Sequence, residues 1–217
     1  GVFALFNTVV AILLVVTTLR YEWAIPNPEK DEDAINLLVI CFIIMSVVSL
    51  ISLPGMFLFL GKFEKYSNLS AIRPYLWLFP LYIIGGGSYQ ALNAWAIRKK
   101  NFTHIAKTRF SQSITGSFIS IGLGAFKFGP LGLLLGGLAS QTAGVGTFAS
   151  LLWKNDHMVL TGIQKRNIVF YFKRYLKFAM LSTGQAIVNT ASLQITTILL
   201  ITYFEAAGVG CYYLAQR

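Results

Sequence analysis

The chain has 217 residues and a net charge of +10, with 55% hydrophobic and only 12% charged residues. A soluble domain carries about 25% charged residues, so this chain has too few charges to build a polar surface over a core of its size. The composition therefore excludes an ordinary soluble domain, argues against a nucleic-acid partner, and favours an all-α integral membrane protein.

Uncharged segments of membrane-spanning length follow one another along the chain. About 20 apolar residues are needed for a helix to cross the hydrocarbon layer. The sequence therefore predicts a polytopic helical bundle with six transmembrane helices plus the start of another. The predicted spans are 2–19, 35–60, 75–97, 110–126, 131–153 and 178–204, and a further helix begins at 209 without being finished.

The first span does not have the features of a signal peptide. No positively charged segment precedes it and no small-residue cleavage site follows it. The chain begins with Gly1 rather than Met, and it ends at Arg217 inside an apparent helix. We therefore expect the chain to be a piece of a longer protein, with sequence missing at both ends.

Proline and glycine occur inside two of the spans. Pro54-Gly55 lies in the second span, and Pro80 with Gly85-Gly86-Gly87 lies in the third. Such residues interrupt helices and permit kinks. Gly132, Gly136, Ser140 and Gly144 recur every four residues in the fifth span, which predicts a face of small side chains for close helix packing.

Amide side chains inside the spans are candidate cavity residues, because a polar group in lipid needs a partner. Asn7 lies in the first span. Gln90 and Asn93 stand near one end of the third span, just before a run of basic residues. No acidic residue lies deep in any span, which argues against a proton relay through a buried carboxylate.

A polar stripe runs along the span 178–204. Its members lie three or four residues apart and so share one face of the helix. This face predicts either a water-filled cavity or a seam in which the side chains bond another helix. Gln185 and Asn189 are its larger members, and the others are Ser182, Ser192 and Thr196.

The basic residues are divided unevenly between the two sets of loops. If all six spans cross, loops 20–34, 98–109 and 154–177 share one side and carry thirteen Lys and Arg, whereas the opposite loops carry four. The positive-inside rule places the thirteen-cation side in the cytoplasm. The basic excess therefore indicates topology and contact with anionic membrane lipids.

Enzyme signatures are missing from the sequence. It contains no Walker loop, no H-E-x-x-H and no G-x-S-x-G motif. The acidic run from Glu29 to Asp33 reads as a solvated helix start, and Cys41 and Cys211 both lie in apolar segments. We therefore expect a protein that is not an enzyme and that has no metal or other cofactor.

Five phrases, in order over nearly the whole chain, carry a family resemblance. They resemble the polysaccharide-transport family of lipid-linked oligosaccharide flippases, within the multidrug/oligosaccharidyl-lipid/polysaccharide exporter superfamily. The phrases are Leu19-Arg-Tyr-Glu-Trp-Ala-Ile-Pro26, Lys30-Asp-Glu-Asp-Ala-Ile-Asn-Leu37, Gln90-Ala-Leu-Asn-Ala-Trp-Ala-Ile-Arg-Lys-Lys-Asn-Phe102, Arg174-Tyr-Leu-Lys-Phe178 and Glu205-Ala-Ala-Gly-Val-Gly-Cys-Tyr-Tyr-Leu-Ala-Gln-Arg217.

The resemblance implies one lobe of a two-lobed flippase fold in the bacterial cytoplasmic (inner) membrane. Residues 1–177 would form five helices of the N-terminal lobe with a cytoplasmic linker, and residues 178–217 the first helices of a truncated C-terminal lobe. The implied substrate is an oligosaccharide linked to undecaprenyl diphosphate, used for polysaccharide or O-antigen (lipopolysaccharide) biosynthesis. The chain lacks a clearly charged mid-membrane site, so a coupling ion, H⁺ or Na⁺, stays open.

The resemblance also gives roles to the candidate residues. Arg20 would bind the diphosphate or form a gate pair with Glu22. The alternative for Arg20 is an interfacial arginine whose charged end reaches water. Sugar hydroxyls would be bound by the amides Asn7, Gln90, Asn93, Gln185 and Asn189.

Other functions remain open at this point. A drug or toxin antiporter of the same superfamily would share the fold. A membrane-embedded glycan polymerase would need large extracytoplasmic loops, and the outer loops here are short. A purely structural membrane scaffold would not need the polar stripe.

Overall fold

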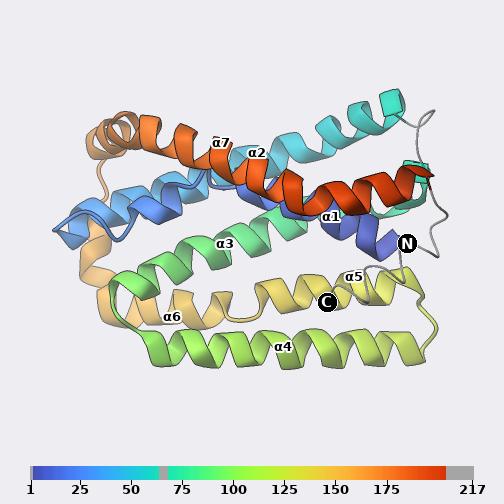
Figure 1. The fold of residues 1–217 in the computed structure, drawn as a ribbon. Coiled ribbons are helices and arrows are strands. Elements are labelled where there is room, and N and C mark those ends of the chain that lie inside the picture. Colours follow the sequence, from blue (N-terminus) through green and yellow to red (C-terminus); the bar gives the residue numbers. More distant parts are fainter. Residues whose placement is uncertain (1, 64–67, 204–217) are drawn as a thin grey trace.

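The computed structural model describes residues 2–63 and 68–203, and its helices run back and forth between the two ends of an elongated bundle (Figure 1). The described residues contain no strand, so the all-α class is confirmed. The predicted helix start at 209 lies outside the described residues. The α-helices are α1 (Val2–Val16), α2 (Asp31–Phe63), α3 (Leu78–Arg98), α4 (Phe102–Ala125), α5 (Pro130–Thr142), α6 (Val145–Asp156) and α7 (Lys165–Tyr203), with 3₁₀ helices η1 (Tyr21–Ala24), η2 (Asn68–Tyr75) and η3 (His157–Gly162).

Two stretches of the described chain, 31–58 and 130–162, are long and apolar enough to cross a membrane. Helix α1 is apolar but shorter. Helices α2 and α3 lie close to the predicted spans 35–60 and 75–97, but α4 begins at Phe102 and α7 at Lys165, well before the predicted starts at 110 and 178. Residues 165–177, expected in a loop, therefore belong to α7, and the count of six spans stays a prediction.

The predicted helix 131–153 is instead two helices, α5 and α6, which corrects the expectation of one continuous span. Ala143 is extended, and Gly144 has a φ of 99°. A side chain at Gly144 would be strained in that conformation, and its Cβ would stand 2.8 Å from Cβ of Thr108 on α4. Glycine thus permits both the turn and the close approach to α4.

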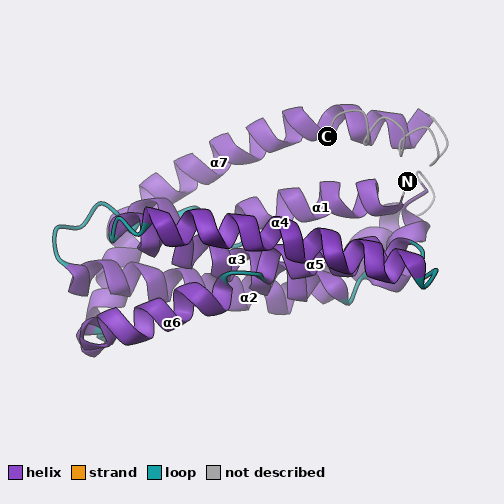
Figure 2. Ribbon diagram, turned by 90° about the horizontal axis from the view of Figure 1, so that it is seen from below, coloured by secondary structure: helices purple, strands orange, loops and turns teal. Residues whose placement is uncertain are grey.

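The small-residue face of α5 packs against α4, as the four-residue spacing predicted. A Cβ on Gly136 would lie 2.9 Å from the carbonyl oxygen of Gly116, and a Cβ on Gly116 would lie 2.7 Å from Cβ of Ser140. Neither helix therefore has room for a larger side chain at these positions. From below, α4, α5 and α6 are nearest to the viewer, and α7 runs along α1 at the edge of the bundle (Figure 2).

The glycine triplet does not interrupt α3, which is continuous from Leu78 to Arg98, so the expected break is wrong. Gly85, Gly86 and Gly87 are buried where neighbouring side chains cross the helix. A Cβ on Gly86 would lie 2.7 Å from both a Leu14 methyl and the Gln141 Oε1. The triplet therefore serves close packing. Helix α2 likewise continues through Pro54.

Two hydrophobic clusters hold the bundle together, one toward each end. The first joins η1, α2 and α3 around Tyr21 and Trp95. The second joins α1, α3 and α5 around Phe6 and Phe79, whose rings stack with centroids 4.3 Å apart. Close van der Waals packing of these side chains holds the neighbouring helices together and keeps α3 at the centre.

The three basic loops gather at one end of the bundle (Figure 1). Arg98 forms an ion pair with Asp31, and Lys99 forms ion pairs with Asp31 and Asp156, so the three loops contact one another. This arrangement agrees with the expectation that they share a side. The cytoplasmic identity of that side stays a prediction.

Candidate functional site

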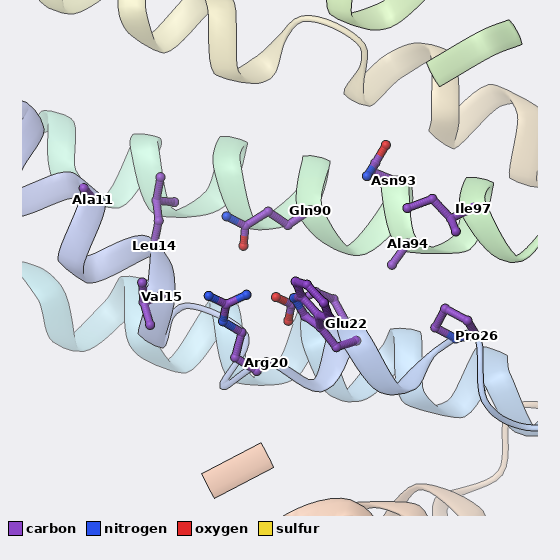
Figure 3. Close-up of a pocket in the computed structure, with 11 residues that line it drawn as sticks. Ala11, Leu14, Val15, Arg20, Glu22, Pro26, Gln90, Asn93, Ala94 and Ile97 are labelled. Carbon is purple, nitrogen blue, oxygen red and sulfur yellow. The ribbon is translucent and has the colours of Figure 1, made fainter. Parts of the chain in front are cut away.

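A cavity of about 610 Å³ lies between the end of α1, η1 and α3 (Figure 3). Four of the predicted site residues line it, namely Arg20, Glu22, Gln90 and Asn93. We call it the arginine cavity. Its remaining lining is mostly apolar and consists of Ala11, Leu14, Val15, Trp23, Pro26, Ala94 and Ile97.

Arg20 reaches the cavity because the chain turns sharply after α1. Leu19 has a φ of 48° and Arg20 a φ of 61°, so two consecutive non-glycine residues adopt the left-handed conformation. This conformation costs roughly 1–2 kcal/mol per residue. The surrounding packing of Leu19 and Tyr21 in the first hydrophobic cluster holds the turn in place. The strained turn therefore positions the only arginine of the cavity lining.

The Arg20 guanidinium is only partly satisfied by the protein. Its central carbon lies 5.3 Å from the centre of the Trp23 ring, a cation–π contact. Its Nε is buried and has no hydrogen-bond partner. Figure 3 shows the side chains of Arg20 and Gln90 directed toward each other across the cavity. An anion between them would meet forked donors, which suit phosphate oxygens.

Glu22 lies beside Arg20 but does not pair with it. The residue is 7% exposed, and its carboxylate accepts a hydrogen bond from the Thr18 hydroxyl. Among the ion pairs of the described residues, none joins Glu22 to Arg20. Burial raises the pKa of Glu22, and the Thr18 hydrogen bond and the Arg20 charge only partly offset it. The gate pair is thus not formed in this conformation.

Gln90 and Asn93 lie three residues apart on α3, so they belong to adjacent turns of one helix face. The oxygens Gln90 Oε1 and Asn93 Oδ1 are buried without a hydrogen-bond partner. In Figure 3 the Gln90 amide extends toward Arg20, whereas the Asn93 amide points away from it. A buried acceptor left unpaired costs about 1–3 kcal/mol, so Gln90 favours a polar occupant beside Arg20.

Asn7 lies in a second, smaller cavity of about 240 Å³ at the junction of α1, α5 and α7. Two other amides, Gln141 and Gln194, line it and were not identified from the sequence. Gln194 lies off the polar stripe of its helix, and Gln141 lies in the last turn of the glycine-rich helix α5. The signal that could have found them is the one used for Gln90, a large amide inside an apolar span.

The structure does not bring Gln185 and Asn189 to either cavity. Both are exposed on α7. The buried face of α7 carries Ala179, Thr183 and Ala186 instead. Gln185 and Asn189 therefore point away from the described helices.

The chain was compared with families, curated proteins and solved structures. The whole chain, residues 1–217, matches the family described as polysaccharide biosynthesis protein. No curated protein and no solved structure gives a significant match. The family match covers every helix and both cavities described above.

Proposed function

The chain belongs to the polysaccharide biosynthesis protein family, and from this premise we propose that it is a flippase for lipid-linked oligosaccharides. The family and the apolar helices indicate a membrane protein concerned with polysaccharides. The proposed substrate is an oligosaccharide on undecaprenyl diphosphate, carried across the bacterial inner membrane for polysaccharide or O-antigen biosynthesis. A multi-pass, non-enzymatic transporter with two lobes would move it by alternating access.

One observation carries the proposal: the arginine cavity holds a cation and amides with unpartnered polar atoms. Arg20 offers several donors in a planar fork, which matches a diphosphate. Gln90 and Asn93 each offer both a donor and an acceptor, which matches sugar hydroxyls. The apolar remainder of the lining suits the first part of a prenyl chain.

The position of the cavity supports transport that starts on the cytoplasmic side. It lies toward the end of the bundle where the basic loops gather (Figure 1), which the positive-inside rule predicts to be cytoplasmic. A lipid-linked unit assembled on that side would meet Arg20 first. Anionic membrane lipids are further expected partners of the basic loops. If H⁺ rather than Na⁺ drives transport, Glu22 is the carboxyl to test.

A drug or toxin antiporter is the second candidate, and Glu22 is the observation that favours it. A buried carboxyl beside the Trp23 ring, in a largely apolar cavity, suits a lipophilic cation. Arg20 in the same lining opposes a cation. The sign of the ligand's charge therefore separates the two functions.

The test uses Arg20→Ala and Arg20→Lys in cells that make the surface glycan. Charge-assisted hydrogen bonds contribute roughly 1.5–3 kcal/mol each, and 1.4 kcal/mol is a factor of ten. We expect Arg20→Ala to lower glycan export about tenfold or more, with lipid-linked units accumulating inside. Arg20→Lys keeps the charge but loses the fork, so it should export partially.

Export is normalised to the amount of protein in the membrane. Arg109→Ala is the matched control, because Arg109 is exposed at the same end of the bundle and lines neither cavity. Full export by Arg20→Ala at a normal protein level would refute the proposal. An antiporter would instead give drug efflux that depends on Glu22 and survives Arg20→Ala.

A further inference from the structure

The smaller cavity is lined by uncharged polar side chains from three helices. Asn7 and Thr8 come from α1, Gln141 from α5 and Gln194 from α7, and we call these four residues the amide site. The Thr8 hydroxyl lies 3.0 Å from the Ala4 carbonyl oxygen and 3.2 Å from Gln194 Oε1. Gln141 Oε1 is buried without a partner. The amide site thus contains a hydrogen-bonding group without a partner in the protein and has no charged side chain.

The amide site adjoins the arginine cavity. Ala11 and Leu14 of α1 line both cavities. Along α1, Asn7 and Val15 are eight residues apart, which corresponds to about 12 Å at 1.5 Å per residue. Gly86 packs beside this junction, because a Cβ there would lie 2.7 Å from both Leu14 and Gln141 Oε1 and would displace them. The two cavities are therefore neighbours along α1, with the side chains of Ala11 and Leu14 in the lining of both.

We propose that the amide site is a second binding site, selective for the hydroxyl groups of sugars distant from the diphosphate. Primary amides donate and accept side by side, as neighbouring sugar hydroxyls do. The lack of any cation in the amide site disfavours a second phosphate. The proposal rests on the proposed flippase function and adds to it a preference for longer glycans.

The consequence is a dependence of affinity on glycan length. A lipid diphosphate that carries one sugar reaches the arginine cavity alone. A longer glycan extends past Leu14 and reaches Gln141 and Gln194. Substitutions in the amide site should therefore weaken binding of long glycans and leave binding of the shortest unchanged.

The experiment measures binding to the full-length protein in lipid nanodiscs by Trp23 fluorescence, since Trp23 lines the arginine cavity. Two probes are compared, undecaprenyl diphosphate with one hexose and the same lipid with a tetrasaccharide. The signal lost in Trp23→Phe identifies the part that reports this cavity. We expect Gln141→Leu and Gln194→Leu each to weaken tetrasaccharide binding about tenfold, with single-hexose binding unchanged.

Gln112→Leu is the matched control, because Gln112 lies on α4 and lines neither cavity. Gly86→Ala tests the junction, because its Cβ would displace Leu14 and Gln141, and it should weaken the tetrasaccharide probe more than the single-hexose probe. Its control is Gly122→Ala, where an added Cβ meets nothing within 4 Å. Retained single-hexose binding shows that each variant is folded.

The outcomes separate the two proposals. Equal weakening of both probes by Gln141→Leu, or weakening of neither, would overturn the amide site while leaving the flippase function standing. If the unsubstituted protein binds neither probe, the flippase function fails and the amide site fails with it. Selective loss of the tetrasaccharide supports both.

Discussion

Two polar regions lie on consecutive turns of α3. In one the polar side chains are fully hydrogen-bonded, and in the other several lack a partner. The first is the charge cluster, made of Asp31, Trp95, Arg98, Lys99 and Asp156. In it, Arg98 Nε lies 2.8 Å from Asp31, and Lys99 Nζ lies 2.6 Å from Asp31 and 2.8 Å from Asp156. Trp95 Nε1 donates to Asp156 at 3.0 Å. The second region is the arginine cavity.

Arg98 shows how fully the charge cluster is satisfied. Besides Asp31, its guanidinium donates to the carbonyl oxygens of Ile25, Pro26, Pro28 and Glu29. Arg20, by contrast, keeps a buried Nε without a partner. Buried polar groups are nearly always paired, so an exception needs a reason. The charge cluster holds the three loops together, whereas the arginine cavity leaves polar atoms free for the proposed ligand.

The largest expected effect is the loss of stability on Arg98→Ala. The Arg98 side chain is 9% exposed, and its removal leaves four carbonyl groups without their donor and leaves Asp31 with Lys99 as its partner. Hydrogen bonds to a charged group contribute about 1.5–3 kcal/mol each, and Arg98 makes several of them, so the total loss should be about 3 kcal/mol or more. The melting temperature of the purified protein should fall, and its amount in the membrane should fall with it.

Arg20→Ala is the comparison for that measurement. It removes a side chain that has few protein partners, so its melting temperature should stay near that of the unsubstituted protein. A drop as large as that of Arg98→Ala would show that Arg20 also fastens the fold, and the contrast between the two regions would not hold.

A matched pair of asparagines gives the next largest effect. Asn36 is fully buried, and its amide bonds the carbonyl oxygens of Glu32 at 2.6 Å and Gly162 at 3.2 Å, and the Gln164 N–H at 3.2 Å. Asn36→Leu leaves these groups unpaired and should cost about 2–3 kcal/mol. Asn93→Leu removes a buried oxygen that has no partner, so stability should stay the same or rise by about 1 kcal/mol.

Thermal unfolding of both leucine variants checks this prediction, and a glycan export assay accompanies it. Asn93→Leu should reduce export although the protein is at least as stable. Equal destabilisation by the two substitutions would mean that Asn93 has a structural partner. Asn93 would then no longer be a candidate ligand-binding group.

The two regions also differ in how far the sequence could predict them. The uncharged runs predicted α2 and α3 near their observed bounds, but α4 and α7 begin earlier than predicted, because these helices continue through basic residues such as Lys107 and Lys173. The break at Gly144 could not be predicted, because it depends on contact with Thr108 of another helix. Arg20, Glu22, Gln90 and Asn93 could be named one by one.

Their meeting in one cavity could not be read from the sequence. It depends on the left-handed turn at Leu19 and Arg20, which no residue pattern indicates because neither position is glycine. The charge cluster was missed for a similar reason. Asp31 and Asp156 belong to different loops, and only the fold shows that both face Lys99.

The smallest expected effect is on how stability depends on pH. The two regions differ in what raises the pKa of their titratable groups. Glu22, in the loop between the first two predicted spans, has its pKa raised above 4.5 by burial. The folded protein therefore holds this proton more tightly than the unfolded chain does. Stability should fall as pH rises from about 4.5 through the folded pKa, and Glu22→Gln should remove this part of the slope.

The pKa of Lys99, in the charge cluster, is also raised, but the cause differs. Burial acts to lower its pKa, but hydrogen bonds to Asp156 and Asp31 outweigh burial and raise the pKa above 10.5. Its stabilising contribution is therefore complete below pH 10.5 and is lost as pH rises through the folded pKa. Melting temperatures of Glu22→Gln and Lys99→Met, followed against pH, should differ from the unsubstituted protein in these two separate windows. If Glu22→Gln leaves the acidic slope unchanged, Glu22 is solvated in the folded protein, and the carboxyl available for H⁺ coupling or for a cationic ligand must be sought elsewhere.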